Sequence, residues 1–223
     1  MKSDLPPSPL DFDPDASDLP RDDLVAVGGD FSVATLLIAY SKGLFPWPVG
    51  PYDLLWFYPV DRAVLFFEDF KVSRSTERDR KKAKLVYSID QHFDDVIAKC
   101  ADVPRPEGAG TWITSTINEA YRNLHRAGLA HSFEVSREGK LVGGVYGVSV
   151  RGAFAAESMF YEEKNTSKHA LAFLVETLSA RGLNWMDCQV LNPFTKSIGA
   201  KEISRKAFRA LLRETQTLGL RIF

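Results

Sequence analysis

The sequence contains very little cysteine and histidine. Only two cysteines occur among its 223 residues, Cys100 and Cys188, and they lie much too far apart in sequence to match a paired metal-ligand motif. Two thiols cannot form the disulfide framework of a small secreted domain. The four histidines have no metal-binding spacing either. We therefore expect no disulfide framework, no bound metal and a reducing compartment.

Long apolar runs are also missing. No stretch approaches the ~18 uninterrupted apolar residues of a membrane-spanning helix. The first residues, Met1-Lys2-Ser3-Asp4, lead into prolines and aspartates, so no secretory signal is expected. With 45% hydrophobic and 26% charged residues, the composition is that of an ordinary globular protein. We expect a cytoplasmic monomer with no membrane partner.

Neither sign of charge dominates, because the net charge is −1. The distribution is uneven, however. Residues 1–30 hold eight aspartates against Lys2 and Arg21, a net of −6, so the remaining 26 basic and 21 acidic residues carry +5. A basic face that binds nucleic acid is therefore compatible with the composition. An acidic tail on a near-neutral protein is the alternative.

Two segments carry dense positive charge. Residues 71–84 hold seven basic side chains against two acidic ones, and residues 196–213 hold six against one. Each segment is either a solvated surface or a contact for a polyanion. In the first segment the candidates for such a contact are Arg74, Arg78, Arg80, Lys81, Lys82 and Lys84.

The first part of the chain has the character of a small unit of its own. Residues 1–23 are rich in proline and aspartate, which predicts an extended segment. This segment either wraps the body as a strap, with Phe12 and Leu19 as the candidate anchors, or is loose. Two clusters of aromatic residues and prolines follow, around Trp47 and Trp56. Since prolines stiffen the backbone, these rings form either an irregular core corner or a wall of a substrate pocket.

The rest of the chain alternates between strand and helix patterns. A hairpin turning at 137–139 precedes a strand over 152–160, a helix that stops at Gly182 and a strand over 183–191. This order predicts a mixed sheet with one βαβ crossover. We therefore predict an α+β fold with domains at 1–62 and 63–223 and a candidate hinge at 103–110.

Two acids interrupt apolar strands in this region, Asp187 and Glu157, and an unpartnered buried carboxylate is costly. Because side chains alternate along a strand, Asp187 and Gln189 are predicted to share one face and Cys188 to lie on the other. A carboxylate can take a proton from an attacking amine, or orient an amide that does so. The alternative is that both acids are satisfied by Lys168 or by backbone amides.

The crossover also suggests an acetyl-coenzyme A-dependent N-acetyltransferase, which would hold pyrophosphate at a helix N-terminus. Here the connecting loop, residues 161–166, has no glycine, and Glu162 and Glu163 would repel a pyrophosphate. This activity therefore remains an alternative without a binding site for its cofactor. A tRNA- or peptide-binding module without catalysis is the second alternative.

A series of ordered motifs runs through the chain. They are Val27–Ser32, Ala39–Trp47, Trp56–Arg62, Thr111–Thr114, His131–Val135, Leu141–Val148, Glu157–Phe160, Ser167-Lys168, Asp187–Val190 and Ser197–Ala200. In these motifs the chain resembles the leucyl/phenylalanyl-tRNA–protein transferase family. The resemblance implies a small N-terminal domain beside a C-terminal domain with an acetyltransferase-like (GNAT-like) fold that uses no coenzyme A.

The same resemblance implies transfer of leucine or phenylalanine, with methionine as a further acyl group, from aminoacyl-tRNA to a protein α-amine. The acceptor would begin with arginine or lysine, and the new peptide bond would mark it for degradation. The partners are then the acceptor end of the tRNA and the acceptor protein. Because the ester is already activated, we expect neither a cofactor nor a metal.

The expected site residues follow from the matching motifs. Asp187, acting through or beside Gln189, would take up the amine proton, and Glu157 would help to hold the acceptor. The segment 71–84 is preferred for the tRNA acceptor arm, because its charge is denser and it adjoins the aromatic clusters. The expected substrate-binding residues are Trp47, Trp56, Trp112, Met159, Phe173 and Ser197.

Overall fold

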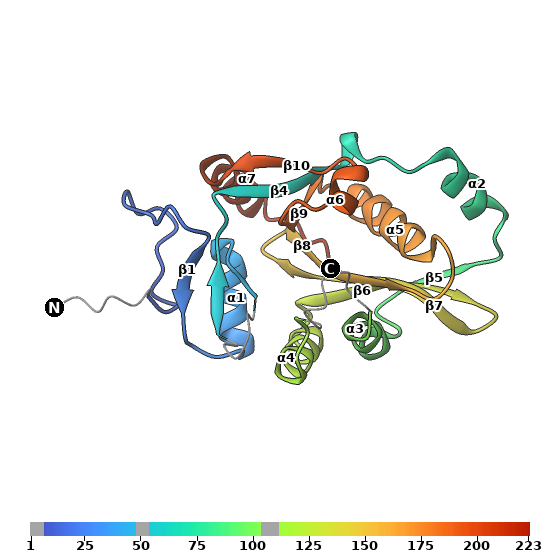
Figure 1. Cartoon of the computed structure of the whole chain (residues 1–223), viewed down its shortest axis with the longest axis horizontal. Helices are drawn as coiled ribbons and strands as arrows, with labels where there is room; N and C mark the ends of the chain where they lie inside the picture. The colour runs from blue at the N-terminus through green and yellow to red at the C-terminus, as the bar shows by residue number, and fades with distance from the viewer. Residues whose placement is uncertain (1–6, 48–53, 104–111) are drawn as a thin grey trace.

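The computed structural model describes residues 7–47, 54–103 and 112–223, which form two sheets and the helices around them (Figure 1). The strands are β1 (Leu24–Val27), β2 (Phe45–Pro46), β3 (Leu55–Phe57), β4 (Asp61–Phe66), β5 (Val86–Ile89), β6 (Ala130–Arg137), β7 (Lys140–Val150), β8 (Ala153–Tyr161), β9 (Trp185–Gln189) and β10 (Lys201–Ser204). The helices are α1 (Val33–Lys42), the short 3-10 helix η1 (Phe67–Asp69), α2 (Arg74–Lys82), α3 (Phe93–Ala101), α4 (Ser115–Arg126), α5 (Thr166–Ala180), α6 (Pro193–Ser197) and α7 (Arg205–Leu218).

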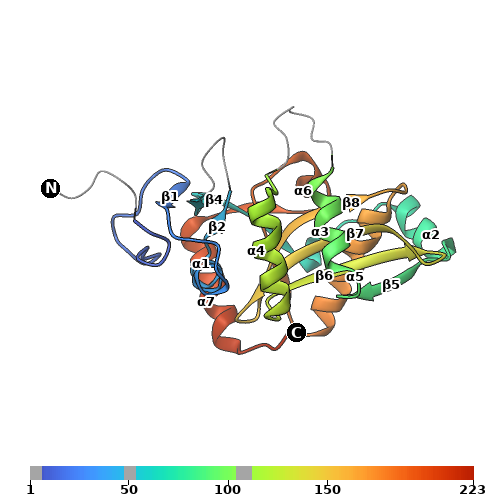
Figure 2. The same ribbon diagram turned by 90° about the horizontal axis from the view of Figure 1, so that it is seen from below.

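The larger sheet has strand order β10-β4-β9-β8-β7-β6-β5. Its described strand pairs are antiparallel except β8 and β9, which run parallel and are connected by α5. The predicted α+β fold, with a mixed sheet and one βαβ crossover, is therefore confirmed. Helix α5 packs on one face of this sheet, and α3 and α4 cover the other (Figures 1 and 2).

The smaller sheet, of order β1-β3-β2, stands at one end of the molecule beside α1. Helix α1 begins where the Ser32 side chain accepts a hydrogen bond from the Thr35 amide, and it ends at Gly43, whose φ of 86° favours glycine. The helix also packs against β7 and α4, so it joins the small sheet to the large one. The domain division at residues 62 and 63 stays a prediction, and the candidate hinge at 103–110 lies outside the described residues except for Val103.

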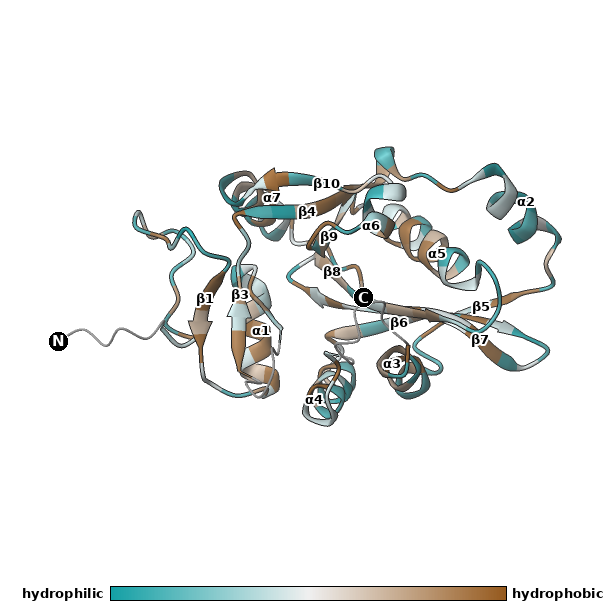
Figure 3. Cartoon of the chain, in the orientation of Figure 1, coloured by the Kyte–Doolittle hydropathy of each residue, from teal (hydrophilic) through white to brown (hydrophobic). Residues whose placement is uncertain are grey.

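The periodicity of each helix or strand determines which of its hydrophobic side chains are buried. In α5 the fully buried Ala170, Leu174 and Leu178 recur every four residues, which is the spacing of one helix face. Helix α2 is the opposite case, because it is almost entirely hydrophilic and only Thr76 among its described side chains is buried (Figure 3). The described part of the chain contains no helix that is long and apolar enough to cross a membrane.

The N-terminal segment, described from residue 7, lies across the C-terminal helix as a strap. Its anchor Phe12 is 4% exposed and meets the Tyr58 ring edge-on at 5.7 Å. The Arg205 guanidinium donates to the carbonyl oxygens of Pro20 and Asp22, at 2.5 and 2.8 Å. The predicted strap is thus present, and it is held by packing and by hydrogen bonds to α7.

This strap also neutralises much of the second basic segment. Asp15 accepts hydrogen bonds from Arg209 at 2.9 and 3.1 Å and from Arg213 at 3.3 Å. Lys201 pairs with Asp69 at 2.8 Å. Asp15 therefore pairs with two arginines of α7, so this face is less available to a polyanion than the sequence alone indicates, although Lys206 and Arg213 stay exposed.

Truncation of the strap anchor tests this arrangement. We expect Phe12→Ala to lower the free energy of unfolding by about 3 kcal/mol, because it removes a buried ring and leaves a cavity. Leu10→Ala is the matched control, since Leu10 lies in the same segment but is 44% exposed, and it should change stability by less than ~0.5 kcal/mol. Urea denaturation measures both. Equal, small effects would show that the strap is not anchored through Phe12.

Candidate active site

A cavity of about 360 Å³ lies where β8 and β9 meet the small sheet and α6. Most of its lining is apolar, and Glu157 and Gln189 are the chemically active side chains that open into it. Trp47, Trp112 and Met159, three of the predicted substrate-binding residues, also line it. Among the described residues, the other apolar side chains of the lining are Phe45, Pro46, Val103, Val145, Ala156, Leu171, Met186, Cys188, Val190, Phe194 and Ile198, and the other polar ones are Ser158, Asn192 and Thr195.

Two β-bulges aim the polar residues at this cavity. In β8, Ser158 pairs with Tyr146 and Ala156 pairs with Gly147, so Glu157 is the extra residue between them. In β9, Asp187 pairs with Val64 and Gln189 with Ala63, so Cys188 is the extra residue there. Bulges redirect side chains and are common beside active sites.

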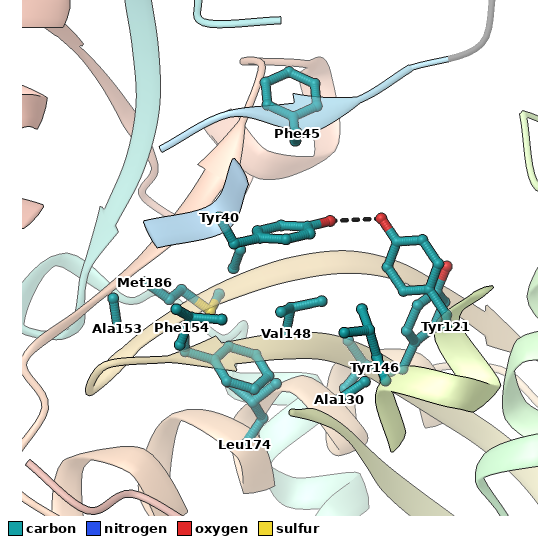
Figure 4. Close-up of a cluster of buried hydrophobic side chains, with 14 of the residues drawn as sticks. Tyr40, Phe45, Tyr121, Ala130, Tyr146, Val148, Ala153, Phe154, Leu174 and Met186 are labelled. Carbon is teal, nitrogen blue, oxygen red and sulfur yellow. Dashed lines mark hydrogen bonds between the residues drawn. The ribbon is translucent and has the colours of Figure 1, made fainter. Parts of the chain in front are cut away.

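Glu157 is held by three neutral donors. The Tyr40 hydroxyl donates to its Oε1 at 2.7 Å, the Gln189 Nε2 donates to the same oxygen at 2.9 Å, and the Tyr121 hydroxyl reaches Oε2 at 3.4 Å. The two tyrosine hydroxyls are themselves 2.5 Å apart (Figure 4). These tyrosines come from α1 and α4, so the carboxylate is fixed from three elements.

Burial dominates the electrostatics of this group. It raises the pKa of Glu157 to about 7, the charge of Asp187 raises the pKa further, and the three hydrogen bonds lower it in part. Burial also raises the pKa of Tyr40 and that of Tyr121 well above their usual values, so both tyrosines stay neutral donors. Glu157 can therefore exchange a proton near neutral pH, as a general base must.

Asp187 has a different environment. Its carboxylate is 6% exposed and is not among the described residues that line the cavity. Instead it accepts hydrogen bonds from the Nε and Nη2 of Arg62 at 2.8 and 2.6 Å. Its Oδ1 also accepts the backbone N–H of Gln189 at 2.8 Å, at a residue whose φ is +63°.

The structure corrects the predicted alternation along β9. Strand periodicity predicted that Asp187 and Gln189 share a face and that Cys188 lies opposite. The bulge breaks this period, so Cys188 and Gln189 both line the cavity while Asp187 faces Arg62. The Cys188 thiol has a pKa raised to about 12, by burial and by the charge of Asp187, and is therefore not a nucleophile.

Three other predicted substrate-binding residues lie elsewhere. Trp56 is fully buried in the small sheet and donates its indole N–H to the Gly28 carbonyl at 2.9 Å. Phe173 is a residue of α5, and its ring packs against those of Tyr87 and Phe133 on the sheet. The Ser197 hydroxyl donates to a carbonyl of its own helix. None of the three is among the described residues that line the cavity, so the structure does not support a substrate contact for them.

Sequence reasoning missed three residues of the site, Tyr40, Tyr121 and Arg62. Tyr40 and Tyr121 lie among the buried, mostly apolar residues of α1 and α4, and Arg62 ends an aromatic motif of the sequence. A hydroxyl on an apolar helix face is a weak signal, since such hydroxyls often meet backbone carbonyls. The buried acids at 157 and 187 were the stronger signal, because each needs a partner.

Comparisons with known proteins identify the family of the chain. Residues 64–213 match the family model described as leucyl/phenylalanyl-tRNA protein transferase, and residues 29–60 match the model of its N-terminal domain. The leucyl/phenylalanyl-tRNA–protein transferase of Desulfatibacillum aliphaticivorans is 43% identical over 202 residues, 91% of this chain and 87% of that relative. That of Hahella chejuensis is 45% identical over 199 residues, 89% of this chain and 85% of the relative.

The chain belongs to the leucyl/phenylalanyl-tRNA protein transferase family. The family resemblance and the aminoacyltransferase class expected from the motifs are thereby confirmed. Among solved structures, L-PGS from Bacillus licheniformis is similar with a TM-score of 0.44 and 10% identity, covering 83% of this chain and 70% of that one.

The sequence position of the basic segment 71–84 suggested that it adjoins the aromatic clusters. In the structure of this transferase family member the segment lies away from them. Helix α2 lies at the end of the molecule opposite to the small sheet (Figures 1 and 2). Arg80 is already paired with both oxygens of Glu176 at 2.5 Å and lies over the Tyr87 ring. Arg74, Arg78 and Lys82 are exposed and four residues apart, so they form one stripe on the helix, and Lys84 is exposed just beyond it.

The raised pKa of Glu157 predicts a specific dependence of stability on pH. The folded protein keeps this proton up to pH about 7, whereas the unfolded chain releases it near pH ~4.3. Between these values the folded state binds more protons, so raising the pH lowers the free energy of unfolding. Relative to Glu157→Gln, the parent should lose about 3 kcal/mol from pH 4.5 to pH 7.5, at ~1.4 kcal/mol per unit. Urea denaturation at several pH values measures this, and parallel curves for the two proteins would contradict it.

Proposed function

We propose that this protein transfers leucine or phenylalanine, with methionine as a further acyl group, from aminoacyl-tRNA to protein α-amines. The acceptor proteins begin with arginine or lysine, and the added residue marks them for degradation. The observation that carries this proposal is the pair Glu157 and Gln189, hydrogen-bonded to each other inside an apolar cavity of a family member. The cavity holds the acyl side chain, and the pair handles the attacking amine.

Two kinds of surface bind the aminoacyl-tRNA donor. The acyl side chain packs among Met159, Leu171 and Met186, flexible or branched apolar side chains that fit an apolar group without branching at Cβ. Trp47 and Trp112 offer aromatic faces at the cavity, on which the terminal base of the tRNA stacks. These contacts place the ester carbonyl beside Glu157.

The chemical step needs one proton acceptor. The neutral acceptor α-amine attacks the ester carbonyl and Glu157 receives the amine proton. The bond between the carbonyl carbon and the 3′-oxygen then breaks, and Glu157 passes the proton to that oxygen, so the tRNA leaves with a free 3′-hydroxyl. Gln189 orients the Glu157 carboxylate through its amide. Asp187 keeps its ion pair with Arg62 and acts by holding the Gln189 backbone, in place of the proton uptake that its sequence context suggested.

The proposal requires no cofactor, because the aminoacyl ester already carries the activation. Holding amine and ester together can supply roughly 7–11 kcal/mol of the barrier reduction. The apolar walls exclude competing water, which favours amine attack over hydrolysis.

The acetyl-coenzyme A alternative is disfavoured by the loop before α5. Glu162 forms ion pairs with Lys99 and Lys140, and Glu163 accepts from Arg137 at 2.9 Å. Both carboxylates thus belong to an ordered network at the helix N-terminus, where a pyrophosphate would have to bind. A binding module without catalysis would not need a carboxylate whose pKa lies near 7.

Transfer can be measured directly with leucyl-tRNA and a peptide that begins with arginine, by the mass of the extended peptide. We expect product from the parent and a loss of about 10²- to 10⁴-fold in kcat for Glu157→Gln, because the variant cannot accept the proton. Glu134→Gln is the matched control, since Glu134 is a fully buried carboxylate held by Ser88 and Ser132 away from the cavity. Full activity of Glu157→Gln would reject its role, and no product from the parent would reject the function.

The tRNA body would be held by the exposed stripe of α2 together with Lys84. We expect reversal of Arg78, Lys81 and Lys82 to glutamate to weaken tRNA binding and to flatten its salt dependence by roughly 0.7–0.9 per lost phosphate contact. Transfer from a minimal 3′-leucyl-adenosine should stay unchanged. Reversal of Lys196 and Lys206 tests the second basic segment in the same assay. Equal losses with minimal donor and whole tRNA would show that α2 supports the fold instead.

A further inference from the structure

Arg62 is a buried cation behind the cavity that does not line it. It lies on β4 and is 1% exposed. Its guanidinium forms a two-pronged hydrogen-bonded ion pair with Asp187, at 2.8 and 2.6 Å. The described cavity lining includes neither member of this pair, so both act on the substrate only through other residues.

The guanidinium lies over two aromatic rings. Its central carbon lies 4.6 Å from the centre of the Phe45 ring and 4.5 Å from that of Phe208. Phe45 belongs to β2 of the small sheet and also lines the cavity, whereas Phe208 belongs to α7. The position of Arg62 is therefore set by both sheets and by the C-terminal helix. A lysine would keep the charge but not the planar fork that fits both the rings and the carboxylate.

From Arg62 a chain of contacts leads into the cavity. The Asp187 oxygen that accepts the Arg62 Nε also accepts the Gln189 backbone N–H. This bond holds Gln189 at a positive φ, which few non-glycine residues adopt without support. Gln189 then donates its side-chain amide to Glu157 at 2.9 Å. Movement of the Asp187 carboxylate would therefore be passed on to Glu157.

Stability alone gives little reason for this ion pair. A buried pair of this kind is often no more stable than apolar side chains of the same volume. Here, moreover, the Nη1 of Arg62 has no hydrogen-bond partner among the described residues, which adds to the cost. An arrangement that is costly for the fold and connected to the reacting carboxylate indicates a functional role.

We propose that Arg62 is a positioning residue for aminoacyl transfer. It holds Asp187 in place, and Asp187 in turn fixes the Gln189 backbone. This sets the direction from which the Gln189 side-chain amide donates its hydrogen bond to Glu157. This inference rests on the proposed function, because it concerns the rate of that reaction. It adds a residue that touches neither substrate nor the cavity.

The test combines Arg62→Lys with the double variant Arg62→Met/Asp187→Leu, which replaces the ion pair by apolar side chains. For both, we expect a folded protein, a kcat for peptide extension lowered by about 10- to 100-fold, and a KM for leucyl-tRNA within about threefold of the parent. Arg181→Lys is the matched control, since its guanidinium also lies over a ring, that of Phe223 at 4.6 Å, and donates to the Ile222 carbonyl. It should leave kcat unchanged.

A second readout separates positioning from simple loss of structure. The groups facing Glu157 are Tyr40 of α1, Tyr121 of α4, and Gln189 and Asp187 of β9. When Gln189 is loosened, its hydrogen bond no longer favours the ionised carboxylate, so the midpoint of kcat against pH should move upward in Arg62→Lys. A variant that had only lost folded protein would keep the midpoint of the parent.

The outcomes are distinguishable. A parent without transfer activity rejects the proposed function and this assignment with it. An active parent with Arg62→Lys active to within threefold rejects the role of Arg62 alone. A double variant active to within threefold rejects in addition the role of Asp187 in holding Gln189. Failure of both Arg62 variants to fold would make Arg62 a residue of the fold and would equally overturn its assignment to positioning.

Discussion

Two carboxylates lie on neighbouring parallel strands among apolar side chains. Each needs hydrogen-bond donors, but a positive charge shared by both would lower the basicity of both. Asp187 receives a full positive charge from Arg62, whereas Glu157 receives only neutral donors, from Tyr40, Tyr121 and Gln189. A single arginine between them would have suppressed the basicity of both. The cation lies over the rings of Phe45 and Phe208 and donates to Asp187, not to Glu157. The pKa of Glu157 is therefore raised by burial and further by the charge of Asp187. The placement of one guanidinium thus separates a structural carboxylate from a reactive one.

The backbone makes this separation possible through its two bulges. Regular alternation would place neighbouring residues of β9 on opposite faces, yet Cys188 and Gln189 both line the cavity. In β7, Gly147 makes the bulge at Glu157 possible. A Cβ at this position would lie 2.3 Å from the Ala155 carbonyl oxygen and 2.6 Å from the Phe154 ring. Only glycine allows β7 and β8 to approach so closely at this point. The bulges and this glycine together place reactive side chains at two central strands of the mixed sheet.

The sequence was sufficient for some parts of this structure and not for others, for physical reasons. The crossover α5 and the cap at Ser32 depend on local periodicity and local hydrogen bonding, which the sequence displays directly. The acids at 157 and 187 stood out because they interrupt apolar strands. A bulge, by contrast, depends on the register of the partner strand, so the position of Gln189 on the same side as Cys188 could not be read from β9 alone. The partner of Asp187 is 125 residues away in sequence, and no local pattern marks it.

The same difference between local patterns and partners that are distant in sequence explains the charged surfaces. Sequence proximity placed α2 beside the aromatic clusters, but the chain crosses the molecule between them, and α2 lies at its far end (Figure 1). The acidic character of the N-terminus could be seen in the sequence, but its partner could not. In the structure Asp15 meets Arg209 and Arg213 of α7, so the strap neutralises one of the two basic segments. The near-zero net charge of the chain therefore conceals an internal pairing that covers α7 and leaves the stripe of α2 as a basic surface facing solvent. Electrostatic attraction falls off within about 10 Å at ordinary salt, so a polyanion would be drawn to this stripe by local contacts and not by the field of the whole protein.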